Sequence, residues 1–241
     1  MFKLSASDIL LLGLATVGDL AENIFIGGGK AYKHSKLLSY FPPGYKKMNL
    51  AQNVYRQIKN KNLVIENNQL LLTKIGDSHL KNRFPLAKLQ QQSWNQRWCI
   101  VSFDIPEKQK QQRNKLRRKL GHIGFAQLQK SIYLSPHPFA KEIVCFIKDV
   151  GLSKYSFVLE GKQKHLQVNQ EKINKLWKTQ EISNSYSKLI ESFNKTNKDY
   201  LYRYLEITAQ DPHLPYELLP PNWPGTKAKK LVSKLISHHS N

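Results

Sequence analysis

The sequence has few of the residues that mark several common classes of protein. Its two cysteines, Cys99 and Cys145, lie in separate apolar runs, and no CxxC or Cys/His cluster accompanies them. This pattern excludes a zinc finger and a disulfide framework, and we expect both cysteines in the core of a cytoplasmic protein. The apolar run Ile9–Val17 is too short to cross a bilayer. We therefore expect a first core helix there and no membrane partner.

Acidic side chains are also scarce. The chain of 241 residues has 38 lysines and arginines against 17 aspartates and glutamates, and its formal net charge is +21. Such a surplus favours a polyphosphate partner over an acidic small molecule, although a merely basic, soluble protein has the same composition. The scarcity also leaves little material for a carboxylate metal site. Between Gln90 and Ala140 the only acids are Asp104 and Glu107.

Familiar catalytic motifs are missing as well. The glycines before Lys30 lack the upstream glycine and the following Ser or Thr of a phosphate-binding loop, and no HExxH, GxSxG or dinucleotide-binding fingerprint occurs. The eight histidines are scattered along the chain. Motifs of this kind therefore predict no catalytic residue, no metal and no cofactor.

The pattern of residues 1–83 is that of a winged helix-turn-helix domain. Ser5 and Asp8 have the spacing of a capping box ahead of the apolar run, and a second helix is predicted over Lys30–Tyr40. A third helix and then two strand-like runs around a pair of turn-forming asparagines follow. Three helices and a hairpin in this order are typical of a winged helix, which binds DNA.

The third helix, predicted over Asn49–Asn60, carries the functional prediction. At about 100° per residue, its apolar side chains gather on one face. These inward residues are Leu50, Ala51, Val54, Tyr55 and Ile58. The other face has no acid, and its Asn, Gln and Arg side chains can bond base edges in the major groove, although an ordinary solvated face is the alternative. With phosphate or minor-groove contacts from the flanking lysines and the hairpin tip, the predicted DNA-binding residues are Lys46, Lys47, Asn49, Gln52, Asn53, Arg56, Lys59, Asn67, Asn68 and Gln69.

The middle of the chain alternates between strands and helices. After a linker over residues 84–96, the pattern predicts strand, helix, two strands, helix and strand. This βαββαβ order over residues 97–168 is that of a ferredoxin-like domain. Residues 169–241 are predicted to form a helical C-terminal domain with a proline-rich turn. The fold class is therefore α+β, in three parts along the chain.

The first predicted helix of the ferredoxin-like part, Glu107–Leu120, is crowded with lysine and arginine. Like charges one turn apart oppose helix formation by ~0.2–0.5 kcal/mol per pair, so we expect a counter-charge. Duplex phosphate, a second subunit or Glu107 can supply it. If phosphate does, a second DNA contact is made by Lys110, Arg113, Arg117 and Arg118.

Two stretches of the chain resemble a known family. Phe103-Asp-Ile-Pro-Glu107, with Gly124-Phe125 and Tyr133-Leu-Ser-Pro136, looks like the ferredoxin-like domain shared by PaaX-type transcriptional repressors and the small CRISPR-associated subunit of the spacer-integration complex. Asp211–Gly225, which ends in Pro-Pro-Asn-Trp-Pro-Gly, resembles the C-terminal segment of the PaaX-type repressors, and the order of the three parts is similar to theirs.

This resemblance implies a homodimeric repressor that binds double-stranded DNA and dimerises through the ferredoxin-like domain. It also implies release from the operator by a small-molecule effector, which in the family's best-known branch is phenylacetyl-coenzyme A. The sequence offers no residue-by-residue match to an acyl-coenzyme A site, so the effector is an expectation from the resemblance alone.

Asp104, at the end of a predicted strand, has two interpretations. As a helix cap, its carboxylate would accept backbone N–H bonds ahead of Pro106 and Glu107. As a metal ligand, two copies of Asp104 in a dimer would hold Mg²⁺ for phosphodiester cleavage. Capping agrees better with the lack of other acids, which makes a DNA-binding regulator the leading hypothesis. The alternatives are a Mg²⁺-dependent endonuclease or CRISPR-adaptation subunit with an appended winged helix, and a winged helix that binds protein within a larger nucleic-acid complex.

Overall fold

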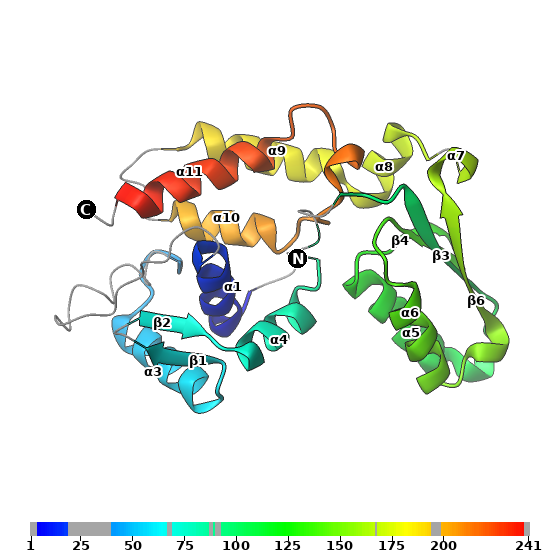
Figure 1. Cartoon of the computed structure of the whole chain (residues 1–241), viewed down its shortest axis with the longest axis horizontal. Helices are drawn as coiled ribbons and strands as arrows, with labels where there is room; N and C mark the ends of the chain where they lie inside the picture. The colour runs from blue at the N-terminus through cyan, green and yellow to red at the C-terminus, as the bar shows by residue number, and fades with distance from the viewer. Residues whose placement is uncertain are drawn as a thin grey trace. The chain divides into compact units, whose positions relative to one another are not determined.

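The computed structural model describes residues 4–18, 40–66, 69–86, 89, 93–166, 168–193 and 199–238, and it has the mixed α+β class that the sequence predicts. Its contacts divide the chain into two compact units, whose elements are labelled in Figure 1. Unit 1 consists of Met1–Phe84, Glu181–Asp211 and Asn222–Asn241, and unit 2 consists of Pro85–Gln180 and Pro212–Pro221. The last part of the chain therefore contributes to both units.

Helix α1 (Ala6–Gly18) of unit 1 starts where the sequence predicts. The Ser5 hydroxyl accepts a hydrogen bond from the backbone N–H of Asp8 at 3.1 Å, and the Asp8 carboxylate accepts one from the N–H of Ser5 at 3.0 Å. The predicted capping box is thus confirmed. Gly13 allows a close approach, since a Cβ atom there would lie 2.6 Å from the ring of Tyr40. The apolar run that follows the cap is buried, as expected of a core helix.

The predicted third helix and hairpin are present as three elements. They are α3 (Lys47–Lys59), β1 (Leu63–Glu66) and β2 (Gln69–Leu72). The strands pair antiparallel with Glu66 opposite Gln69, so only the two asparagines at the tip lie between them, outside the described residues. Residues 30–39 of the predicted second helix are also outside the described part of the chain.

Helix α4 (Lys74–Arg83) was not predicted from the sequence. Thr73 caps it, because its hydroxyl accepts a hydrogen bond from the N–H of Gly76 at 3.0 Å. Gly76 also lies against the turn after α3, where a Cβ atom would come within 2.1 Å of the Asn62 carbonyl oxygen. The Thr cap and the acidic Asp77 in the first turn were the available sequence signals, but the short helix has no strong apolar period.

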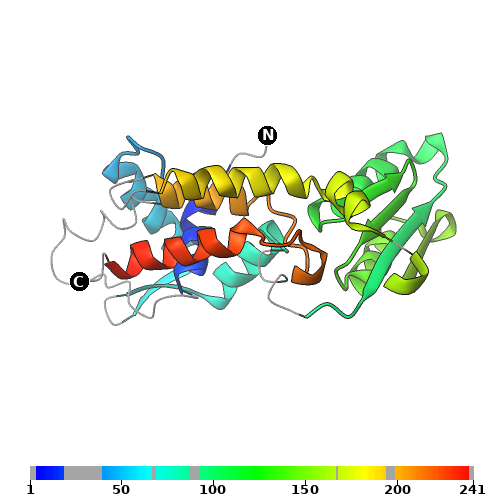
Figure 2. The same cartoon turned by 90° about the horizontal axis from the view of Figure 1, so that it is seen from above.

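Unit 1 is completed by helices from the last part of the chain. They are most of α9 (Thr179–Glu191), α10 (Tyr200–Thr208) and α11 (Pro224–His238). Helices α10 and α11 lie alongside each other in both views (Figures 1 and 2), and α1 packs against α10. The buried Tyr186 hydroxyl donates a hydrogen bond to the Asp211 carboxylate at 3.0 Å. Tyr186, Tyr200, Tyr204 and Trp223 are buried core residues of unit 1.

Unit 2 is built on an antiparallel sheet with the strand order β4-β5-β3-β6. Its strands are β3 (Arg97–Phe103), β4 (Ala126–Gln129), β5 (Ile132–Ser135) and β6 (Ser156–Lys162). Helices α5 (Lys110–His122) and α6 (Ala140–Asp149) cover one face (Figure 1). Val101, Leu116 and Ile143 are fully buried between sheet and helices. This order of elements and strands has the connectivity of a ferredoxin-like domain.

Short elements fill the rest of unit 2. They are the 3₁₀ turns Glu107–Gln109, Ser153–Tyr155 and Tyr216–Leu218 and the helices α7 (Gln163–Leu166) and α8 (Gln170–Trp177). The Trp177 indole donates a hydrogen bond to the Gly124 carbonyl oxygen at 3.0 Å, which ties α8 to the start of β4. None of the helices in the described ranges has the length and apolar character needed to cross a membrane.

The two cysteines have different surroundings. Cys99 is buried in β3, and burial, with a smaller effect from Glu160, raises the pKa of its thiol to about 12. Cys145 is exposed on α6, so the prediction that both cysteines are core residues is wrong for Cys145. Its neighbours Ile143 and Ile147 take the inward face of α6 instead.

Candidate nucleic-acid interface

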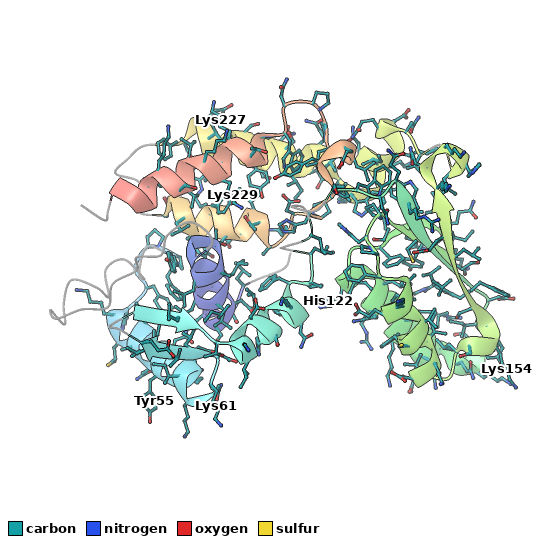
Figure 3. The ribbon with its side chains drawn as sticks, in the orientation of Figure 1. Tyr55, Lys61, His122, Lys154, Lys227 and Lys229 are labelled. Carbon is teal, nitrogen blue, oxygen red and sulfur yellow. The ribbon has the colours of Figure 1, made fainter. Side chains whose placement is uncertain are left out.

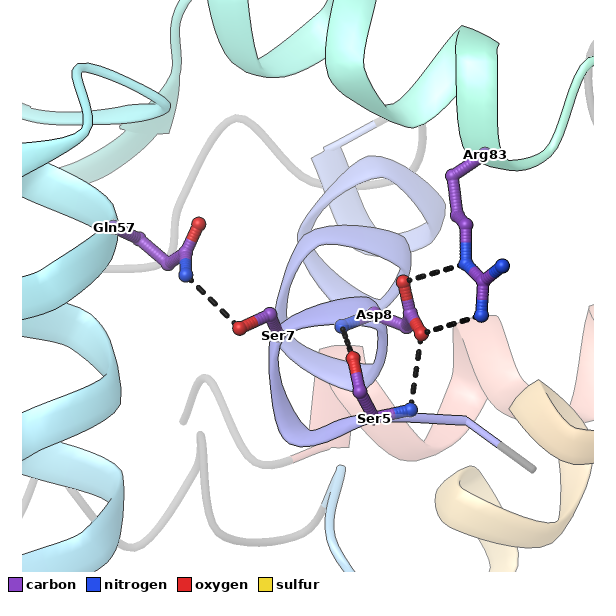
Figure 4. A network of polar contacts seen from close by, with 5 residues as sticks. All are labelled: Ser5, Ser7, Asp8, Gln57 and Arg83. Carbon is purple, nitrogen blue, oxygen red and sulfur yellow. Dashed lines mark hydrogen bonds and ion pairs between the residues drawn. The ribbon is translucent and has the colours of Figure 1, made fainter.

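Buried amide side chains determine which face of α3 is turned outward. The Asn53 amide nitrogen donates to the Ala6 carbonyl oxygen at 2.8 Å, and its amide oxygen accepts from the Ser7 hydroxyl at 3.2 Å. One turn later the Gln57 amide donates to the same Ser7 hydroxyl at 3.0 Å (Figure 4). These bonds attach α3 to the first turn of α1 and give the buried amides of Asn53 and Gln57 hydrogen-bond partners.

This packing corrects the predicted face. Asn53 is only 5% exposed, so its prediction as a DNA contact on the outer side is wrong. Tyr55, which the apolar pattern placed inward, is 70% exposed. A helical pattern of apolar residues assigns polar amide side chains to the outer face. It contains no information about Ser7, which gives the amides of Asn53 and Gln57 a buried partner. We call the exposed side of α3 the α3 outer face and define it as Met48, Asn49, Gln52, Tyr55, Arg56 and Lys59.

The other predicted DNA-binding residues divide into two groups. Those that the structure places on the outside are Lys46, Lys47, Asn49, Gln52, Arg56 and Lys59. Asn67, Asn68 and the side chain of Gln69 lie outside the described part of the chain. Lys61, which was not predicted, adds an exposed cation at the turn after α3 and is labelled in Figure 3. Helix α3 itself contains no acidic residue, so nothing on this helix neutralises its cations.

An ion pair holds α4 against the start of α1. The Arg83 guanidinium donates to both carboxylate oxygens of Asp8, at 3.2 and 3.3 Å (Figure 4). Burial alone would raise the pKa of Asp8, but the hydrogen bonds from Arg83 and Ser5 outweigh it and lower that pKa below its ordinary value. The capping box, the amide contacts of α3 and this ion pair thus converge on one turn of α1.

The basic helix α5 is arranged differently. Glu107 accepts a hydrogen bond from Arg113 at 2.7 Å and pairs with Lys110 at 3.5 Å. Arg117 donates to the Lys130 carbonyl oxygen at 3.3 Å and lies over the Phe103 ring. Of the four residues predicted for a second DNA contact, three therefore have partners within the protein. The fourth, Arg118, is exposed.

Asp104 does not cap the helix that follows it. The first 3₁₀ turn begins at Glu107 after Pro106, and α5 begins after Gln109, neither with a side-chain cap. The Asp104 backbone N–H donates to the Tyr155 carbonyl oxygen at 2.8 Å, and its side chain is exposed. The capping interpretation is therefore wrong. In the described ranges, His, Cys, Asp and Glu side chains nowhere gather in groups of three or more suited to a metal ion.

Unit 1 contains an exposed basic helix followed by a hairpin, and unit 2 has the connectivity of a ferredoxin-like domain. Two protein-family models match: one described as the PaaX protein central Cas2-like domain over residues 91–173, the other as the PaaX-like protein C-terminal domain over residues 177–241. The matches together cover more than half of the sequence. The chain belongs to the PaaX-type family, with similarity to Cas2 in its central domain, which confirms the resemblance seen in the sequence.

The fold is shared with a solved structure. An uncharacterized protein, Rv0674 from Mycobacterium tuberculosis, is similar with a TM-score of 0.63 and 14% sequence identity, over 99% of this chain and 97% of the other. At this identity the likeness concerns the fold alone. No curated protein matches the chain.

Proposed function

We propose that the chain is a transcriptional regulator that binds duplex DNA sequence-specifically and acts as a homodimeric repressor. The α3 outer face carries this proposal, because it presents Gln52, Asn49 and Arg56 on a helix without acids, in a chain of the PaaX-type family. Amide and guanidinium side chains can bond two atoms of one base edge in the major groove. The β1–β2 hairpin that follows α3 takes the place of the wing in this proposed winged helix.

The lysines around α3 would supply binding that does not depend on sequence. Lys46 precedes α3 and Lys47 is its first residue, while Lys59 is its last residue and Lys61 lies in the turn before the hairpin. Cations that neutralise phosphates release counterions from DNA, so affinity falls steeply with salt. The net charge of +21 favours the same partner.

Exposed apolar side chains on β6 support the homodimer. Phe157 is 67% exposed and Leu159 56% exposed, and they pair with Ser102 and Ile100 of β3 on the face opposite α5 and α6. Large apolar side chains exposed together on a sheet are typical of an interaction surface, and a second copy would cover them. Phe157→Asp should then lower the molecular mass measured by sedimentation to that of a monomer. Val144→Asp, at an exposed apolar position on α6, is the matched control.

The DNA experiment measures binding and cleavage together. The full chain is titrated into labelled duplex from directly upstream of its own coding sequence and into scrambled duplex of equal length, at several salt concentrations, with and without Mg²⁺ or Mn²⁺. We expect preference for the upstream duplex, a linear fall of log affinity with log salt, and intact DNA. Equal affinity for both duplexes would contradict sequence-specific binding. Release of the bound duplex by a coenzyme A thioester would support the effector that the family resemblance implies.

The endonuclease alternative is tested in the same reactions. Asp104 directly follows β3, and its side chain is exposed to solvent. If DNA is cleaved in Mg²⁺ or Mn²⁺ and Asp104→Ala abolishes the cleavage, the chain is a metal-dependent nuclease. Under the regulator proposal, Asp104→Ala leaves DNA affinity unchanged and no cleavage is seen with either protein.

A further inference from the structure

Two large, mostly apolar side chains lie on the α3 outer face. Tyr55 is 70% exposed and Met48 67% exposed. With Gln52 between them, the residue spacing of four and then three places all three on one stripe of the helix. Figure 3 shows Tyr55 on the outer side of α3.

This stripe cannot turn inward without losing buried hydrogen bonds. Asn53 and Gln57 hold the opposite side of the helix against Ala6 and Ser7, through bonds of 2.8 to 3.2 Å. Leaving buried amides without partners costs ~1–3 kcal/mol each. The exposure of Tyr55 and Met48 is therefore a built feature of the helix. A single exposed apolar residue needs no explanation, but two on the stripe that faces a proposed ligand do.

The chemistry of the major groove offers these side chains a partner. Among the base edges in that groove, only thymine presents an apolar group, its C5 methyl. The stripe is surrounded by lysines and an arginine, and α3 contains no acid. This positive charge complements the negative charge of duplex DNA. Gln52, between the two, has the amide that can bond both adenine positions in the groove.

We propose that Tyr55 and Met48 determine sequence specificity by contacting thymine methyl groups next to an adenine that Gln52 bonds. Each half-site would then contain A·T pairs under the middle of α3. This inference rests on the proposed function, since it names the bases that the same helix would bind.

The test removes the methyl group without changing base pairing. A preferred duplex is first selected from a random-sequence library with the full-length chain, and each thymine is then replaced singly by uracil. Affinity is measured by fluorescence anisotropy. We expect uracil at one or two positions to weaken binding about fourfold, as burial of one methyl group implies, and uracil elsewhere to have no effect.

Variants assign the sensitive positions to side chains. Tyr55→Ala should bind thymine and uracil duplexes equally well at one sensitive position, and Met48→Ala at the other. Tyr55→Phe should keep the sensitivity, because the ring and not the hydroxyl makes the contact. Tyr216→Ala removes another exposed tyrosine, in unit 2, and should leave all affinities unchanged. Thermal unfolding of each variant checks that it is folded.

The outcomes distinguish failure of the proposed function from failure of the thymine-methyl contacts alone. Selection of no preferred sequence would overturn the proposed function and this inference with it. A preferred sequence whose uracil forms all bind as tightly as the thymine form would overturn only the methyl contacts. Uracil sensitivity that persists unchanged in both Tyr55→Ala and Met48→Ala would do the same, because other residues would then read the methyl groups.

Discussion

Helices α3 and α5 are both thirteen residues long and basic, but their charges have different surroundings. On α5 the density of lysine and arginine is higher, yet Arg113 is paired with Glu107 and Arg117 with a backbone carbonyl and an aromatic ring. On α3 the cations are fewer and exposed, while the hydrogen bonds to the rest of the protein are made by Asn53 and Gln57. The number of charges in a segment therefore does not show where charge is available to a partner.

The largest effect should be seen in DNA affinity when the two helices are compared directly. Replacing Gln52 and Arg56 together by alanine removes two base contacts of ~1–3 kcal/mol each, so we expect a loss of about 30-fold to about 20,000-fold on a preferred duplex. Replacing Arg113 and Arg117 together should change affinity by less than about threefold, because neither side chain is free. Equal losses from both pairs, measured by anisotropy at one salt concentration, would contradict the distinction between the helices.

Alanine at Gly76, beside the turn after α3, and alanine at Gly121 of α5 should have opposite effects on the free energy of unfolding. At Gly76 a Cβ atom would lie 2.1 Å from the Asn62 carbonyl oxygen, whereas at Gly121 of α5 it would meet nothing within 4 Å. Gly76→Ala should lower the free energy of unfolding by at least ~1–3 kcal/mol, since rigid backbone must move. Gly121→Ala should raise it by ~0.5 kcal/mol through helix propensity. Urea denaturation of both variants measures the contrast, and a stable Gly76→Ala protein would show that the turn after α3 can shift.

Neighbouring residues on α3 should show opposite effects. Asn53→Ala removes buried hydrogen bonds to Ala6 and Ser7 and should cost ~1–3 kcal/mol of unfolding free energy. Gln52→Ala, on the outer face, should change stability by less than ~0.5 kcal/mol but weaken DNA binding. Thermal unfolding and anisotropy on the same samples separate the two. If Asn53→Ala lost DNA affinity without losing stability, the original prediction for Asn53 would be restored.

Acidification should affect the two units in different pH ranges. Burial, with a further contribution from His213, lowers the pKa of His137 in unit 2 to about 4 from 6.5, and a hydrogen bond to the Pro212 backbone opposes this. Between pH 6.5 and 4, His137 is therefore protonated in the unfolded chain but neutral in the folded unit. The stability present above pH 6.5 is lost as the pH falls toward 4, with a slope of up to about 1.4 kcal/mol per pH unit.

Asp8 of unit 1 acts below that range. Its pKa is lowered, so its contribution is complete above its ordinary value of 3.8 and is lost as the pH falls through the lower folded value. Urea denaturation between pH 7 and 3 should show the loss from His137 first, and His137→Gln should remove that first loss while leaving the one below pH 4. A first loss that is unchanged in His137→Gln would assign it to another group.

Sequence reasoning performed best where local chemistry decides structure. The capping box at Ser5, the hairpin around residues 67 and 68 and the alternation of strands and helices over residues 97–162 follow from hydrogen-bonding side chains and periodicity within a short window. The family resemblance rested on local segments of the same kind. The three-part division along the chain stays a prediction, since residues 181–241 contribute to two compact units that local pattern cannot separate.

The misses on α3 and α4 have a long-range cause, and the one at Asp104 has a local cause. Asn53 was predicted outward because its partners, Ala6 and Ser7, lie far away in the sequence, and the same error of face placed Tyr55 inward. Asp104 was predicted to cap α5, but the chain inserts a 3₁₀ turn before the helix begins. Helix α4 escaped notice because its stability comes from packing and from the pair between Arg83 and Asp8.

By itself, then, the sequence determined the capped first helix, the third helix with its hairpin, the alternating elements of residues 97–162, the excess of positive charge and the family, because capping, periodicity and local motifs act within a few residues of one another. Tertiary structure decided which side of α3 is exposed and which cations of α5 are already paired. A helix can present any of its sides until something packs against it, and the bonds of Asn53 and Gln57 to the distant first turn of α1, with the burial of Leu50, leave Tyr55, Gln52 and Arg56 outward together.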